Sequence, residues 1–305
     1  MVAVLTSSGP RALLSPQLRP LLQRSAACAA ARAPAPVASV ASSVAAVLPA
    51  PLAPLAAAVS SLPLWVCDGG SSLFLVIASI AWIKICNALS GAGVTSQYLS
   101  RKLVHMGSGP LFLVFWPLFS TTRGGQLAAI SVPVMSLARL MVAGKAAEGS
   151  ERGAELVRAI SRSGDKHEAL EGPFKYTIVL LLATIFGWRS PVSAVAICQM
   201  GIGDGMADVM GRRFGKTKWP RSIERTGKKS IEGTLAFAAF AFAASAAMLF
   251  YFGVAGLTAT PLRAALGPLA LISLAAALVE VLPLGDDNFT VPLAAALMSV
   301  WLLPV

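Results

Sequence analysis

Residues 190–213 read SPVSAVAICQMGIGDGMADVMGRR, and this stretch joins an apolar segment to a pair of carboxylates. Its first part, approximately 190–206, is apolar enough to form most of a membrane-spanning helix, which needs about 20 apolar residues. Asp204 and Asp208 are four residues apart, so they share one face if the segment is helical. Ionised side chains at membrane depth are costly and usually functional. The stretch therefore predicts a helical membrane protein with a polar site at one end of a span.

The composition of the whole chain favours the same fold class. Hydrophobic residues make up 56% of the 305 residues and charged residues only 13%, whereas a soluble domain carries about 25% charged residues. Helices satisfy their backbone polar groups internally, as a lipid environment requires. We therefore expect an all-α fold, a polytopic transmembrane helical bundle of about seven or eight spans. The candidate spans are approximately 72–90, 108–122, 125–144, 174–188, 190–206, 231–254, 264–283 and 289–304.

The first 65 residues differ in composition from the rest of the chain. They are rich in Ala, Ser, Pro and Arg, and the first acidic residue is Asp68. This composition is typical of an organellar transit peptide, and the abundance of Ala, Ser and Pro favours the chloroplast over the mitochondrion. We expect residues 1–65 to be a chloroplast transit peptide and linker. Residues 66–305 would then form a transmembrane domain in a chloroplast membrane, either envelope or thylakoid.

The positive charge of the chain has two separate explanations. The formal net charge is +11, but the basic residues lie between apolar spans and form no recognisable nucleic-acid-binding module. Membrane loops and an anionic substrate together account for the excess. We therefore expect no nucleic-acid partner, and the sequence gives no indication of an oligomeric state.

Asp204 and Asp208 are predicted to hold one divalent cation. Mg²⁺ prefers one or two carboxylates together with phosphate oxygens. Glycines around the pair would let the backbone approach a phosphate ligand closely. These glycines are Gly203, Gly205 and Gly211. The alternative is a structural pair of aspartates that cap a helix or bind the arginines that follow.

A cluster of cations follows the two aspartates. Residues 210–230 contain eight Lys or Arg residues and a single acid, Glu224. Lys binds phosphate as a point charge, and Arg can bind it through two parallel hydrogen bonds. Lys228 and Lys229, directly before a span, are the leading candidates for nucleotide or phosphate binding, together with Arg212. An ordinary positively charged membrane loop is the alternative, and no Walker A motif is present.

Three further side chains are candidates for catalysis, because each could take the proton of an alcohol. His105 lies at the start of a predicted span and could act as a general base, or it could simply anchor the span at the interface. Glu280 lies near the end of an apolar region and needs a partner there. Asp287 follows in an acidic turn, where the carboxylates of Glu280, Asp286 and Asp287 could supply a second metal site or a base. Alternatively, Asp287 or Asn288 could cap the last helix. The sequence does not rank the three candidates.

Taken in order along the chain, these motifs resemble those of a known group of enzymes. The specific part runs from Gly203 to Gly233 and contains GDGxAD, GRR and KSxEG. The other elements are Arg101-Lys102-x-x-His105, Ser161-Arg-Ser-Gly-Asp165, Gly172-Pro173, and Glu280 followed by Asp286-Asp-Asn-x-Thr290. Together they resemble the phytol kinase and farnesol kinase group of plants and algae, which is related to dolichol kinases and to CTP-dependent cytidylyltransferases. The resemblance covers approximately residues 72–305.

The resemblance implies a polytopic chloroplast enzyme whose kinase domain is residues 66–305. It would transfer the γ-phosphate of CTP to an isoprenoid alcohol such as phytol, with Mg²⁺ as cofactor. The product, phytyl phosphate, would serve tocopherol synthesis and phytol recycling. The alcohol would arrive from the bilayer and the nucleotide from water. A farnesol or geranylgeraniol kinase and a CTP-dependent lipid cytidylyltransferase are alternatives, and a transporter with intramembrane aspartates is a third class.

Overall fold

The computed structural model describes residues 62–146, 166–221, 223–224 and 228–304, all within the unit Pro36–Val305. Within these ranges the protein is helical and contains no β-strand, apart from one isolated bridge between Lys218 and Ser230. The predicted all-α fold is confirmed. The transit-peptide prediction lies almost entirely outside the described residues, and so does the motif at 161–165.

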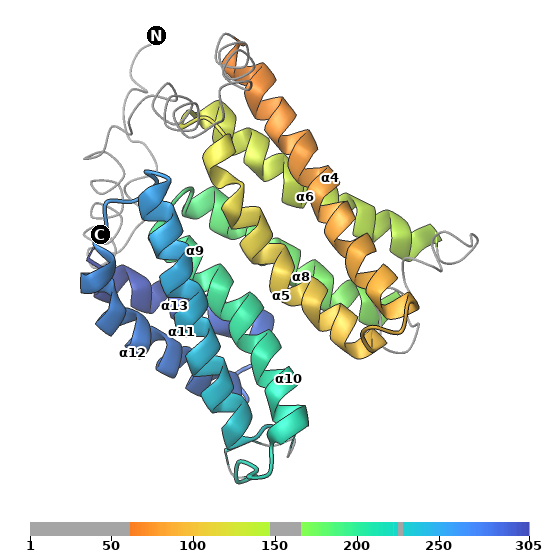
Figure 1. Cartoon of the computed structure of the whole chain (residues 1–305), viewed down its shortest axis with the longest axis vertical. Helices are drawn as coiled ribbons and strands as arrows, with labels where there is room; N and C mark the ends of the chain where they lie inside the picture. The colour runs from red at the N-terminus through yellow and green to blue at the C-terminus, as the bar shows by residue number, and fades with distance from the viewer. Residues whose placement is uncertain (1–61, 147–165, 222, 225–227, 305) are drawn as a thin grey trace, which may run out of the picture. The chain divides into compact units, whose positions relative to one another are not determined.

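Figure 1 shows the helices of the described residues in the order in which they follow one another along the chain. In chain order they are α4 (Leu64–Gly91), α5 (Gln97–Val114), the 3₁₀ turn η3 (Trp116–Leu118), α6 (Arg123–Ala146), α8 (Lys166–Phe186), α9 (Pro191–Cys198), the π-helical turn η4 (Gln199–Gly203), α10 (Asp204–Phe214), α11 (Ile231–Val254), α12 (Leu262–Val281) and α13 (Asp287–Leu302).

Two groups of helices pack around a shared central element. In the first group, α4 packs against α5 and α6, and α6 packs against α8. In the second group, α11 packs against α10 and α12, and α12 packs against α13. Figure 1 shows α4 and α5 side by side, with α9 and α10 between α5 and α11. The α9–α10 segment therefore connects the two groups, and it carries Asp204 and Asp208.

Four helices in the described part of the chain are long and apolar enough to cross a membrane. They are Leu64–Gly91, Arg123–Val142, Ile231–Val254 and Leu262–Val281. Each contains an 18-residue window that is apolar on average and holds at most two charged side chains. The apolar part of α8, Gly172–Phe186, is shorter.

Several predicted spans differ from the helices that form, since α4 begins at Leu64 rather than at 72 and α8 begins at Lys166 rather than at 174. The span predicted at 108–122 is the second half of α5 and the turn after it, because α5 begins at Gln97, where the Ser96 hydroxyl accepts a hydrogen bond from Leu99 N at 3.2 Å. The span predicted at 190–206 continues to Phe214. In both cases hydropathy marks the apolar part of the helix and misses its amphipathic end, which carries the charged residues.

A π-helical turn interrupts the central helix immediately before Asp204. The backbone stays helical on both sides of the turn, at Cys198 (φ −65°, ψ −41°) and at Asp204 (φ −60°, ψ −43°). Gln199 begins the turn, and its amide donates hydrogen bonds to Ser245 at 3.1 Å and to Ser273 at 2.8 Å. These two partners belong to α11 and α12, so the turn is fixed to two neighbouring helices. Single π-helical turns occur frequently at functional sites.

Candidate active site

A cavity of about 1280 Å³ is lined by residues from α4, α5, α6, α8, α10, α11, α12 and α13. It contains most of the side chains that the sequence predicts to be functional. These are His105, Asp204, Asp208, Gly211, Arg212, Lys228, Lys229, Glu280 and Asp287. Gly203 and Gly205 do not line it. The fold thus gathers residues from widely separated parts of the chain around one space.

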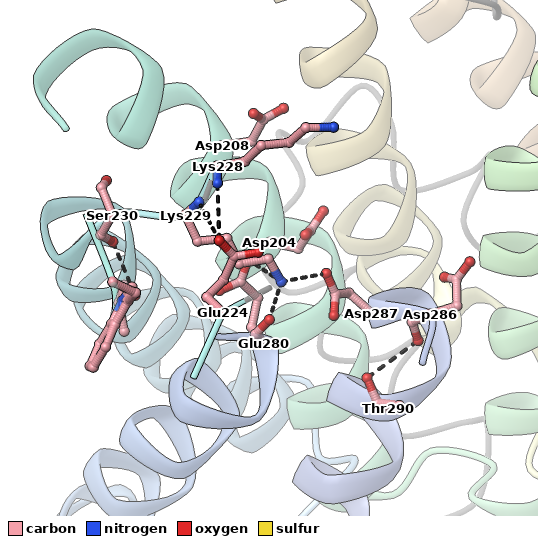
Figure 2. A network of polar contacts seen from close by, with 12 residues as sticks. Asp204, Asp208, Glu224, Lys228, Lys229, Ser230, Glu280, Asp286, Asp287 and Thr290 are labelled. Carbon is pink, nitrogen blue, oxygen red and sulfur yellow. Dashed lines mark hydrogen bonds and ion pairs between the residues drawn. The ribbon is translucent and has the colours of Figure 1, made fainter. Parts of the chain in front are cut away.

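Three of the carboxylates that line this cavity lie close to one another. One oxygen each from Asp204, Glu280 and Asp287 lies within 4.8 Å of the other two. They come from the start of α10, the end of α12 and the first turn of α13 (Figure 2). Carboxylate oxygens at this spacing suit a hard divalent cation such as Mg²⁺. The structure therefore groups Asp204 with the two acids that the sequence offered as catalytic candidates.

Lys229 provides a cation for this acidic cluster. Its Nζ lies 3.2 Å from Glu280 Oε1 and 2.9 Å from Asp287 Oδ2, and it also donates to the backbone carbonyl of Glu280. Figure 2 shows both carboxylates directed at the Lys229 side chain. Burial lowers the pKa of Lys229, but the two carboxylates outweigh it and leave the pKa above its ordinary value. Lys229 is therefore charged and offsets part of the repulsion among the acids.

Asp208 has a different set of partners. Lys102 Nζ lies 2.9 Å from Asp208 Oδ2 and 3.8 Å from Asp204 Oδ2. Arg212 donates from Nε to Asp208 Oδ1 at 2.7 Å, and its guanidinium lies over the ring of Tyr98 at 4.6 Å. Asp204 and Asp208 share a helix face as predicted, and the cation beside both of them is the Lys102 ammonium.

His105 lies against Asp204. Its Nε2 is 3.3 Å from Asp204 Oδ2 and 3.3 Å from the carbonyl oxygen of Met200. Both partners can only accept, so the hydrogen-bond network assigns the hydrogen to Nε2. The His105 ring also packs on Tyr176 with centroids 4.7 Å apart. In this arrangement Nε2 donates a hydrogen bond and has no lone pair available for an alcohol proton.

The glycines around Asp204 allow neighbouring helices to approach α10. A Cβ at Gly203 would lie 2.7 Å from the ring of Phe237, and one at Gly205 would overlap Met106. A Cβ at Gly211 would lie 3.3 Å from Ser230 Oγ. Packing against these neighbours explains Gly203 and Gly205. A phosphate-binding role at Gly211, which does line the cavity, stays a prediction.

The segment before α11 is organised by an acid that the sequence reasoning did not select. The buried Glu224 carboxylate accepts hydrogen bonds from Lys228 N at 3.0 Å and Lys229 N at 3.5 Å. Ser230 then caps α11 by accepting from Gly233 N at 3.2 Å. The sequence feature that could have pointed to Glu224 is its position as the single acid among the eight Lys and Arg residues of 210–230. Glu224 fixes the two backbone positions that place Lys228 at the cavity edge and Lys229 inside it.

The start of α13 shows a second difference from the sequence prediction. Asp286 caps the helix by accepting from Asn288 N at 3.0 Å, so neither Asp287 nor Asn288 is the capping residue. Lys175 on α8 lies 2.7 Å from Asp286 Oδ2. Burial raises the pKa of Asp286, but Lys175 outweighs it and leaves the pKa below its ordinary value. Because Asp286 forms the cap, Asp287 is available to point into the acidic cluster.

Fold and site together describe a helical protein with several helices apolar enough to cross a membrane and with a cavity lined by clustered acids and cations, and comparison with known proteins identifies its family. The chain is 39% identical over 236 residues to the probable chloroplastic phytol kinase of Triticum aestivum, covering 76% of each chain. It is 35% identical to chloroplastic phytol kinase 1 of Arabidopsis thaliana, covering 76% of this chain and 75% of that protein. It is 36% identical to the chloroplastic farnesol kinase of Arabidopsis thaliana, covering 72% and 71%.

The chain belongs to the family of chloroplastic phytol and farnesol kinases of plants. No protein-family model matches the chain, and no solved structure is significantly similar to it.

Proposed function

We propose that this protein is an isoprenoid-alcohol kinase that phosphorylates phytol in a chloroplast membrane. Its relatives are named chloroplastic phytol kinase and farnesol kinase. The observation that carries the proposal is the cavity itself, because one space joins the cluster of acids and cations to an apolar region. A kinase acting on a lipid alcohol needs both chemistries side by side. Farnesol or geranylgeraniol is the alternative acceptor.

The phosphate donor in this proposal is CTP, and the cofactor is Mg²⁺. Phosphoryl transfer depends mainly on positioning and on neutralising charge. Asp204, Glu280 and Asp287 offer the oxygen donors that Mg²⁺ prefers, and the bound cation would withdraw charge from the phosphates. Lys102 and Lys229 each lie beside this set of carboxylates. Both ammonium groups are close enough to contact phosphates that bind there.

A carboxylate is a better candidate than His105 for the base that accepts the alcohol proton. His105 donates from Nε2 to Asp204 and so holds that side chain in place. Asp287 lies at the start of α13 and is more exposed than Glu280. When Lys229 turns from Asp287 toward phosphate, the Asp287 oxygen becomes available to the alcohol. His105 is then a positioning residue, and Asp287 is the proposed base, with one carboxylate oxygen toward the cation and the other toward the alcohol.

The proposed membrane topology has eight spans, if α9, η4 and α10 are counted as one. The sequence predicts about seven or eight spans, and four of the helices are long and apolar enough by themselves. Polar contacts between helices also fall into two groups, one on the side of the bundle that carries the site and one on the other side. Lys102–Asp208, Lys175–Asp286 and Lys229–Asp287 join ends on the side of the site. Asp68–Ser120 and Arg189–Phe119 join ends on the other side.

This alternation fits successive helices that cross in opposite directions. The charged part of the cavity would then face water at one membrane surface. A nucleotide could enter there while the alcohol enters from the bilayer.

The position of a radiolabel tests the proposed reaction directly. Membranes that contain the full chain are supplied with phytol, Mg²⁺ and CTP labelled at either the α- or the γ-phosphate. A kinase places only the γ-label in phytyl phosphate. The cytidylyltransferase alternative is tested in parallel with phytyl phosphate as the acceptor, where it would place the α-label in the lipid. Appearance of the α-label in lipid would contradict the kinase assignment.

A further inference from the structure

The cavity extends away from the acids into an apolar arm between four helices. Its walls are regular helix faces, because the lining residues recur at spacings of three and four along each helix. From α5 come Val104, Ser108 and Phe112, and from α6 Val132, Pro133, Ser136 and Leu140. From α8 come Pro173, Tyr176, Thr177 and Leu180, and from α4 Ser79 and Ile83. We use the term apolar arm for the space bounded by these residues.

The Ser and Thr hydroxyl groups in the apolar arm are already satisfied within their own helices, whereas the buried Tyr176 hydroxyl has no hydrogen-bond partner among the described residues. Each Ser or Thr hydroxyl donates to the carbonyl oxygen four residues earlier. The pairs are Ser79 to Leu75 at 2.8 Å, Ser108 to Val104 at 2.6 Å, Ser136 to Val132 at 3.0 Å and Thr177 to Pro173 at 2.7 Å. A hydrocarbon chain can therefore lie against them without stranding a polar group. Their small size leaves the space that a chain would fill.

Aromatic rings close the far end of the arm. Phe112 is buried, and its ring meets Trp116 edge to face with centroids 5.9 Å apart. Trp116 is fully buried and packs on Trp188 at 5.1 Å and on Phe252 at 5.9 Å. The space beyond Phe112 is thus filled with close-packed side chains. A chain that lies in the arm can extend no farther than the Phe112 ring.

We propose that Phe112 sets how much of an isoprenoid chain the protein buries in the apolar arm. The inference rests on the proposed function and concerns the same cavity. His105, beside the acids, and Phe112 lie on one face of α5 and are seven residues apart. Seven residues of α-helix span about 10 Å. A chain short enough to end before Phe112 is buried completely, whereas a longer chain has to fold back or leave part of itself outside the arm.

Two substitutions change the arm in opposite directions. Phe112→Ala removes the ring and lengthens the arm toward Trp116. Ser136→Leu introduces a larger side chain on the α6 wall and narrows the arm. Ala138→Leu is the matched control, because it adds the same side chain to an exposed position of α6 outside the cavity. None of these residues belongs to the charged part of the site.

The measurement is kcat/KM of the full-length protein for geraniol, farnesol, geranylgeraniol and phytol. Relative to geraniol, Phe112→Ala is expected to raise the preference for the longest alcohols about tenfold, and Ser136→Leu to lower it about tenfold. Ala138→Leu keeps the wild-type ratios. Since Phe112→Ala opens a core position and can impair folding, Ser136→Leu provides the independent reading. Folded variants that keep the wild-type ratios, or lose activity equally for every alcohol, would overturn the inference. A wild-type protein that phosphorylates none of the alcohols would instead refute the proposed function.

Discussion

Lys229 Nζ lies 2.9 Å from Asp287 Oδ2. This ion pair joins the segment before α11 to the first residue of α13. The same ammonium is 3.2 Å from Glu280 Oε1 at the end of α12. One lysine therefore connects three chain segments around the acidic cluster. In the proposed function these acids would hold a divalent cation, which would take over part of the charge balance that Lys229 provides and leave its side chain free to contact a phosphate.

Lys229→Ala is expected to lower kcat for phytol phosphorylation by about 100-fold, the typical effect of removing one preorganised group that stabilises charge. Lys228→Ala is the matched control, because Lys228 is the neighbouring lysine and its side chain is exposed. It should lower kcat by about tenfold or less. Steady-state rates at saturating phytol and CTP make the comparison. A larger loss in Lys228→Ala than in Lys229→Ala would reverse the assignment of the two residues.

Asp287→Asn and Asp208→Asn should separate the two sets of acids. Asp287 belongs to the cluster with Asp204 and Glu280, whereas Asp208 binds Lys102 and Arg212. We expect Asp287→Asn to raise the Mg²⁺ concentration for half-maximal activity by about tenfold. Asp208→Asn should mainly raise the KM for CTP, because it releases Lys102 and Arg212 from their fixed positions.

The same two variants can be titrated with Mn²⁺ in the absence of substrates, which measures cation binding without catalysis. If Asp208→Asn weakens Mn²⁺ binding while Asp287→Asn leaves it intact, the pair predicted from sequence, Asp204 with Asp208, is the metal site.

Gly203→Ala is expected to destabilise the protein by about 1–3 kcal/mol through overpacking. The new methyl group would lie 2.7 Å from the Phe237 ring, which is completely buried and has no room to move away. Gly69→Ala is the control, since no atom lies within 4 Å of a Cβ there and Ala favours a helix interior. Thermal unfolding in detergent compares the two. Equal melting temperatures would show that Gly203 in η4 and Phe237 in α11 are less closely packed than described.

Gln199→Leu should lower both stability and kcat. The change leaves the hydroxyls of Ser245 and Ser273 without their amide donor, at a cost of about 1–3 kcal/mol, and it loosens the π-helical turn that precedes Asp204. Ser299→Ala is a matched control, because the Ser299 hydroxyl is equally buried but has no hydrogen-bond partner. A Gln199→Leu protein with wild-type kcat would show that the turn does not position Asp204.

Hydropathy and helical spacing predict the helices well but place several of their ends incorrectly. The apolar run 231–254 coincides with α11, because Ser230 caps its start and few charges interrupt it. The span predicted at 108–122 misses the first eleven residues of α5, since Arg101, Lys102 and His105 lower its hydropathy. The Ser96 cap was the available signal for the true start.

The sequence predicts the individual residues of the candidate site but not which of their side chains contact one another. Asp204 and Asp208 could be placed on one face because both belong to α10, and local spacing determines that relation. Lys229 and Asp287 are 58 residues apart, and only the packing of α11, α12 and α13 brings them together. For the same reason no local pattern could indicate that Lys102, from α5, would lie beside both aspartates.

The most direct test of the account is phosphate transfer from Mg-CTP to phytol by the purified full-length protein in detergent, with Asp204→Asn measured beside it. Detergent offers no second compartment, so turnover there also excludes transport as the sole activity. We predict that the wild type forms phytyl phosphate and that folded Asp204→Asn loses at least about 100-fold in rate. A folded wild type without product, or an Asp204→Asn protein as active as the wild type, would contradict the proposed kinase and its acidic centre.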